Sequence, residues 1–145
     1  MKPVLTALLL FAAGCADGDS AGLRLDDPWA RPSPPAATTA AIYLTIGNET
    51  EVAETLVGVI TEACRVTELH ASSMDDGVMN MQQMEAGIEI PASTTVVLQP
   101  GGMHIMCIDK MTDFAPNELL HLELEFVDGG GTRHTESITA VVEDR

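Results

Sequence analysis

The sequence predicts an all-β fold, either a sandwich or a small barrel of short strands. Runs of β-forming residues recur along the chain, and turn signals rich in Gly, Pro, Asn and Asp separate them. The run at residues 119–126 (LLHLELEF) alternates strictly between apolar and polar residues, as a half-buried strand does. Its inward residues are expected to be Leu120, Leu122, Leu124 and Phe126, with His121, Glu123 and Glu125 facing solvent.

The remaining strands follow from the same pattern, taken in chain order. Pro32, Pro34 and Pro35 deny a helix to the segment that follows Arg31. The expected strands cover residues 39–46, 53–59, 64–70, 77–84, 88–90, 94–99, 103–108, 119–126 and a segment within 133–142. In this reading His70 ends its strand, and the turn Asp75-Asp76-Gly77 leads into the next one.

Length and composition fit one domain. The chain has 145 residues, of which 46% are apolar but only 3% aromatic, so the core must rest on aliphatic residues and Met. The net charge of -15 argues against nucleic acid as a partner, because the surface repels phosphates. It is compatible with cations, with a basic partner, or simply with solubility.

The N-terminus resembles a bacterial lipoprotein signal. Residues 4–13 form an apolar run too short to span a bilayer, and Ala12-Ala13-Gly14-Cys15 resembles a lipobox. By that resemblance, residues 1–14 are a signal peptide and Cys15 carries lipid; secretion without lipid is the alternative. Residues 15–27 are expected to be an acidic tether and residues 28–145 the folded domain. Either way the domain is expected outside the cytoplasm, in the periplasm or on the outer face of a bacterial membrane.

Two further cysteines, Cys64 and Cys107, leave two possibilities open. In an oxidising compartment they can form one disulfide, or they can remain two buried thiols.

Four residues stand out as metal ligands: His70, Met81, His104 and Met106. His104 and Met106 are two apart in an expected strand, so both side chains reach the same face. A mixed imidazole and thioether set favours Cu(I) over Zn²⁺ or hard cations, because thioether sulfur is a soft ligand. Each residue alone is ordinary, and the combination carries the hypothesis.

The other candidate residues have weaker interpretations. His121 is expected to be solvated, and His134 and Met111 receive no role. Four more methionines crowd the same region and can be either a copper-collecting surface or packing residues. They are Met74, Met79, Met84 and Met103.

At these residues the sequence resembles the periplasmic copper chaperones called PCu(A)C. Ten residues separate His70 from Met81, and twenty-two separate Met81 from His104-Ile105-Met106, which is similar to that family's ligand signature. The resemblance extends over residues 28–142. It is carried further by Trp29-Ala30-Arg31-Pro32, Ala41-Ile42-Tyr43-Leu44-Thr45-Ile46, Glu68-Leu69-His70, Leu98-Gln99-Pro100-Gly101-Gly102 and Leu122-Glu123-Leu124-Glu125-Phe126.

The resemblance implies a cupredoxin-like Greek-key β-sandwich that binds Cu(I) through His70, Met81, His104 and Met106. It also implies delivery of copper to the CuA centre in subunit II of cytochrome c oxidase, alone or with a Sco-type copper protein. The lipobox and the cysteine pair are not part of the family pattern. Strand alternation points Cys107 away from Met106, so Cys107 is not expected in the copper site.

Three other functions are weighed against the chaperone. A blue-copper electron carrier needs a Cys thiolate facing the metal. Copper storage or detoxification uses the same four ligands without a dedicated client, and a non-metal β interaction domain needs no copper at all. An enzyme is not expected, because no recognisable catalytic constellation is present in the sequence.

Overall fold

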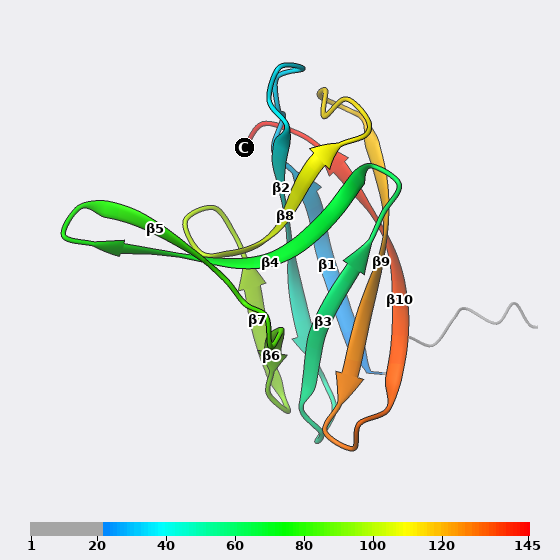
Figure 1. Ribbon diagram of the computed structural model, residues 1–145. Helices are drawn as coiled ribbons and strands as arrows, with labels where there is room; N and C mark the ends of the chain where they lie inside the picture. The colour runs from blue at the N-terminus through cyan, green and yellow to red at the C-terminus, as the bar shows by residue number, and fades with distance from the viewer. Residues whose placement is uncertain (1–21) are drawn as a thin grey trace, which may run out of the picture.

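The computed structural model describes residues 22–145. This part of the chain contains ten strands and no helix (Figure 1). The predicted all-β fold is therefore confirmed. The strands are β1 (Leu23–Ala30), β2 (Thr39–Asn48), β3 (Glu54–Ile60), β4 (Cys64–Asp75), β5 (Val78–Gln83), β6 (Ile88–Ile90), β7 (Thr94–Leu98), β8 (Met103–Lys110), β9 (Leu119–Asp128) and β10 (Arg133–Val142). Nothing helical in this part of the chain is long and apolar enough to cross a membrane.

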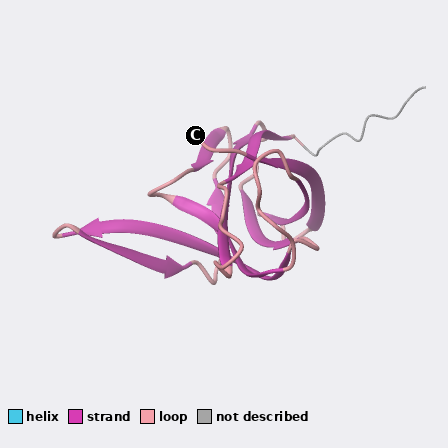
Figure 2. Ribbon diagram, turned by 90° about the horizontal axis from the view of Figure 1, so that it is seen from above, coloured by secondary structure: helices cyan, strands magenta, loops and turns pink. Residues whose placement is uncertain are grey.

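All ten strands belong to one hydrogen-bonded sheet that curls into a sandwich. Their order is β5-β4-β8-β2-β1-β10-β9-β3-β6, and β7 pairs with the second half of β2. Seen from above, the sheet folds round on itself (Figure 2), which brings β3 beside β4. The hydroxyl of Thr67 on β4 donates a hydrogen bond to the carbonyl of Val59 on β3, so a side chain helps to close the two layers.

Alternating apolar residues from the curled sheet fill its interior. On β9 the four residues expected to face inward are all buried, while His121 and Glu123 are exposed, as predicted. Partners across the sandwich include Ile42, Leu44 and Ile46 on β2. Burial on one face of the strands that line this interior fixes their register, because a one-residue slip would expose the whole apolar set.

The first strand begins earlier than the sequence suggested. Residues 23–27 were expected in the tether, but they belong to β1, where Leu23 is buried and pairs with Asn48. That part of the prediction is wrong, because Leu23 enters the core while its neighbours stay in solvent. The predicted signal peptide, Cys15 and the rest of the tether lie outside the described residues.

A long hairpin formed by β4 and β5 projects from the body of the sandwich (Figures 1 and 2). His70 was expected to end its strand, but β4 continues to Asp75, so His70 lies in the strand's interior. Every residue of β5 is exposed, and the hairpin is therefore held by pairing with β4 rather than by burial.

The cysteine alternative is settled in favour of a disulfide. Cys64 on β4 and Cys107 on β8 are bonded, with their Cα atoms 5.4 Å apart, and both side chains are buried. The bond joins the two strands that carry the histidines of the candidate site.

Candidate metal centre

The two candidate histidines lie side by side on neighbouring strands. The antiparallel register of β4 and β8 places His70 directly opposite His104. Their ring centroids are 5.6 Å apart and the ring planes meet at 62°. Directly opposed residues project from the same face of a sheet, so both imidazoles can reach one ion.

Met106 joins the histidines on this face. It lies two residues after His104 on β8 and opposite Glu68 on β4, which is itself two residues before His70. The period of two along each strand therefore puts all four side chains on one side of the sheet. Met106 is partly buried.

Met81 lies on the same face but in a more open position. It pairs with Ser72 on the projecting hairpin, which makes it a diagonal neighbour of His70 across the β4–β5 ladder. Diagonal neighbours are about 7–8 Å apart at the backbone, within reach of a methionine side chain. The side chain is 54% exposed, so the structure brings three candidate ligands together and leaves the fourth at the solvent edge.

His104 is held in the form that binds metal. It is only 3% exposed, and its Nδ1 donates a hydrogen bond to the carbonyl of Gly102 at 3.2 Å. With the proton on Nδ1, the lone pair of a neutral imidazole lies on Nε2. Burial lowers the pKa of His104; the carbonyl of Gly102 opposes this shift and the neighbouring His70 adds to it. The ring therefore stays neutral where an exposed histidine would begin to take up a proton.

His70 is oriented by a carboxylate that sequence reasoning gave no role. Its Nε2 lies 2.7 Å from Oε2 of Glu68, so Nε2–H donates to the carboxylate, and in the neutral ring Nδ1 carries the lone pair. Nδ1 is buried and has no hydrogen-bond partner among the described residues. A buried nitrogen without a partner is unfavourable unless something binds it, and a metal ion satisfies that requirement. Glu68 could have been found from its position two residues before His70 in the same strand.

Aromatic rings continue the row beyond His104. Tyr43 on β2 lies 6.3 Å from the His104 ring, centroid to centroid, and Trp29 on β1 lies 4.6 Å from the Tyr43 ring. Both residues are buried, and burial raises the pKa of the Tyr43 hydroxyl, partly offset by Arg31. Trp29, Tyr43 and His104 thus form a continuous row of buried rings.

The structure places the remaining cysteine and histidine candidates outside the metal centre. Cys107 is disulfide-bonded and fully buried, so it offers no thiolate of the kind that a blue-copper site requires. His121 is exposed and bonds to the hydroxyl of Thr139. His134 stacks on Phe126 with centroids 5.5 Å apart.

The four extra methionines divide into two pairs. Met84 and Met103 are partly buried and pack against the core. Met74 and Met79 face each other across the hairpin and are 63% and 54% exposed. The packing interpretation therefore holds for the first pair only.

Solved structures share this fold. The apo PCuAC domain from PmoF1 superposes with a TM-score of 0.66 at 19% identity, covering 86% of this chain and 95% of that one. The copper-bound PCuAC domain from PmoF2 gives 0.64 at 22% identity, covering 86% and 94%. Apo-DR1885 from Deinococcus radiodurans gives 0.61 at 23% identity, covering 99% and 95%. The predicted cupredoxin-like sandwich is thus the fold of these PCuAC domains.

Comparison of sequences gives similar proteins and a family. A protein named "Putative lipoprotein" from Leifsonia xyli subsp. xyli is 27% identical over 135 residues, covering 86% of this chain and 80% of that protein. An uncharacterized protein of Rickettsia prowazekii is 26% identical over 111 residues, covering 74% and 61%. Residues 23–138 match the family described as "Putative lipoprotein LpqE-like", which takes in nearly all of the folded domain. The chain therefore belongs to the LpqE-like lipoprotein family.

Proposed function

We propose that this protein is an extracytoplasmic copper chaperone that binds Cu(I) through His70, Met81, His104 and Met106. The observation that carries the proposal is the pairing of the two histidines, each of which offers one ring nitrogen when neutral. One of these, Nδ1 of His70, is buried without a partner among the described residues. The proposed role is binding and transfer rather than catalysis.

The donor set fits Cu(I) in its chemistry. Two neutral imidazoles with thioether sulfurs form a soft, uncharged set, which suits Cu(I) better than Zn²⁺ or hard cations. Glu68 does not need to bind the ion, since its carboxylate already accepts a hydrogen bond from Nε2–H of His70. Such an outer carboxylate fixes the tautomer and orientation of a ligating histidine.

The uneven exposure of the ligands suits transfer. His104 is buried and fixed by Gly102, whereas Met81 lies at the solvent edge. An incoming client can displace the exposed thioether first, while the histidines still hold the ion. A thioether is a neutral ligand and binds without a proton change, so the exchange needs no other reactant.

Similar proteins support both the cargo and the location. A copper-bound PCuAC domain and a CuI-bound form of DR1885 are among the solved structures with this fold. The lipoprotein description of the family supports lipid attachment at Cys15 and a site of action in the periplasm or on the outer membrane face. We propose the CuA centre of cytochrome c oxidase subunit II, or a Sco-type protein, as the client.

The proposal is tested by titrating Cu(I) against a competing chelator. The native chain is expected to bind one ion tightly, and His104→Ala is expected to lose it. His121→Ala is the matched control, because His121 is exposed on β9 and lies outside the site. Equal Cu(I) affinity in the native chain and His104→Ala would show that the four-ligand site is wrong.

A transfer experiment separates a chaperone from a storage protein. The copper-loaded chain is mixed with the apo form of an oxidase CuA domain, the two proteins are separated, and the copper in each is measured. A chaperone passes its ion to the acceptor faster than a complex of Cu(I) with the chelator of the titration does. A storage protein retains it.

A further inference from the structure

The projecting hairpin carries three methionines on one face. In the register of β4 and β5, Met74 pairs with Met79, Ser72 with Met81, and His70 with Gln83. Side chains at alternate positions share a face, so Met74, Met79 and Met81 all lie on the face that carries His70. The opposite face of the hairpin has no methionine. The thioethers are thus placed in line with the two-histidine centre.

The turn at the end of the hairpin fixes this arrangement. Asp76 and Gly77 form a two-residue connection with φ of 50° and 80°. Two consecutive positive φ values are typical of the tight hairpin turn that sets strand register. Met74 and Met79 are therefore held directly opposite each other, with Cβ atoms expected about 4.5–5.5 Å apart.

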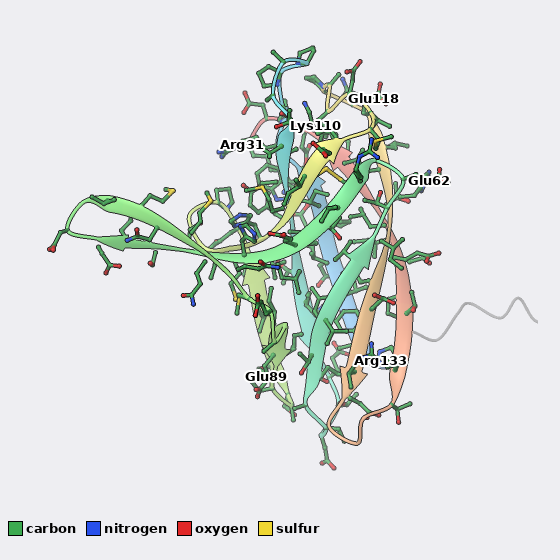
Figure 3. The ribbon with its side chains drawn as sticks, viewed as in Figure 1. Arg31, Glu62, Glu89, Lys110, Glu118 and Arg133 are labelled. Atoms are coloured by element: carbon green, nitrogen blue, oxygen red, sulfur yellow. A yellow bond between two sulfur atoms is a disulfide. The ribbon has the colours of Figure 1, made fainter. Side chains whose placement is uncertain are left out.

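Packing does not account for these methionines. Met74 is 63% exposed, and Met79 and Met81 are each 54% exposed, whereas Met84 and Met103 pack on the core. Figure 3 shows sulfur atoms along the hairpin, which extends into solvent. Exposed thioethers contribute little to folding stability, because they remove little apolar surface from water.

We propose that Met74 and Met79, with Met81, form a second Cu(I) site on the hairpin, weaker than the two-histidine centre. Thioethers select soft ions. Asp75 and Asp76 lie at the hairpin turn and add negative charge that attracts cations. The site takes up Cu(I) from solvent and passes it along the face to His70.

Movement between the two sites requires only ligand exchange. A bond between copper and a thioether sulfur breaks as a bond between copper and an imidazole nitrogen forms, and copper remains Cu(I) throughout. Met81 lies between the pair at the tip and His70, so it can serve either site. The inference rests on the proposed function for the direction of transfer, but the existence of the hairpin site does not depend on it.

The test uses Ag(I), a stable diamagnetic ion with the same preference for soft ligands, together with Cu(I) titrations against a chelator. Methionine methyl resonances of the full chain are followed by NMR as Ag(I) is added. The first equivalent is expected to move Met106 and Met81, and the second Met74 and Met79. The Met74→Leu/Met79→Leu variant is expected to lose the second equivalent and keep the first with unchanged affinity.

Controls separate this inference from the proposed function. Met111→Leu removes an exposed methionine outside the hairpin and is expected to keep both equivalents. His70→Ala/His104→Ala is expected to lose the tight equivalent and keep the weak one. If the native chain binds the tight equivalent but no weak one, the hairpin site is overturned. If it binds the weak equivalent but no tight one, the four-ligand centre is overturned. A weak equivalent that persists in the double leucine variant would also refute the hairpin site.

Discussion

Oε2 of Glu68 lies 2.7 Å from Nε2 of His70, and this contact determines which nitrogen of His70 is free. The carboxylate accepts a hydrogen bond from Nε2–H, so in the neutral ring the lone pair lies on Nδ1, the buried atom without a partner among the described residues. The two histidines of the centre thus present different nitrogens. Nδ1–H of His104 donates to the carbonyl of Gly102, so His104 offers Nε2.

Replacement of Glu68 is expected to weaken copper binding without removing a ligand. Glu68→Ala should lower Cu(I) affinity by about 10–100-fold, the usual effect of losing an outer partner of a ligating histidine. Glu68→Gln keeps an acceptor oxygen and should recover part of the loss. Nitrogen NMR of His70 should show the Nε2–H tautomer in the native protein and a mixture in Glu68→Ala. Glu62→Ala, at an exposed glutamate labelled in Figure 3, is the control. Unchanged Cu(I) affinity in Glu68→Ala would contradict the role of Glu68 in orienting His70.

Met106→Ile tests the thioether on β8. Isoleucine suits a strand and leaves no sulfur, so the fold should persist while Cu(I) affinity falls by about tenfold or more, which is ~1.4 kcal/mol. Chelator competition measures the affinity and thermal unfolding checks the fold. Met103→Ile is the matched control, because Met103 also lies on β8 but packs against the core. Native affinity in Met106→Ile would remove Met106 from the centre.

Alternation along single strands could be predicted from the sequence, whereas pairing between distant strands could not. The shared face of His104 and Met106 follows from their spacing alone. The opposition of His70 and His104 depends on the register of β4 against β8, which the whole curled sheet determines. The family resemblance implied only that the two histidines bind one ion, not that they lie opposite each other.

Strand ends were missed where burial does not mark them. Residues beyond His70 on β4 are increasingly exposed and are ordered by pairing with β5, so no apolar pattern extends the strand. At the start of β1, Leu23 is buried among polar neighbours, and the strand is irregular between Asp26 and Trp29. Only Leu23 and Leu25 are apolar between Gly22 and Pro28, and so short an apolar pattern resembles a linker.

The disulfide is expected to stabilise the fold without binding copper. Replacing both Cys64 and Cys107 by Ala should lower the free energy of unfolding by about 2–4 kcal/mol, because the unfolded chain loses a cross-link. Urea denaturation measures this loss, and the native protein under reductant should behave similarly. At temperatures where the variant remains folded, the tight Cu(I) equivalent should persist. Loss of copper binding in a folded variant would mean that the bond is needed to position β4 against β8.

A buried carboxyl far from the metal centre predicts how stability varies with pH. Glu54 is 5% exposed, and its Oε2 has no hydrogen-bond partner among the described residues. Burial raises the pKa of Glu54 above its ordinary value of 4.5, although the nearby His134 opposes the shift. A raised folded pKa means that this group's stabilising contribution is complete below the unfolded value and is lost as pH rises through the folded one.

Glu54→Gln should therefore be more stable than the native protein at neutral pH, by about 1 kcal/mol. The difference in unfolding free energy should shrink as pH falls toward 4.5. Glu89→Gln, at an exposed glutamate on β6, should show no such trend, and a Glu54→Gln variant less stable than native at neutral pH would show that the carboxylate is satisfied in solution.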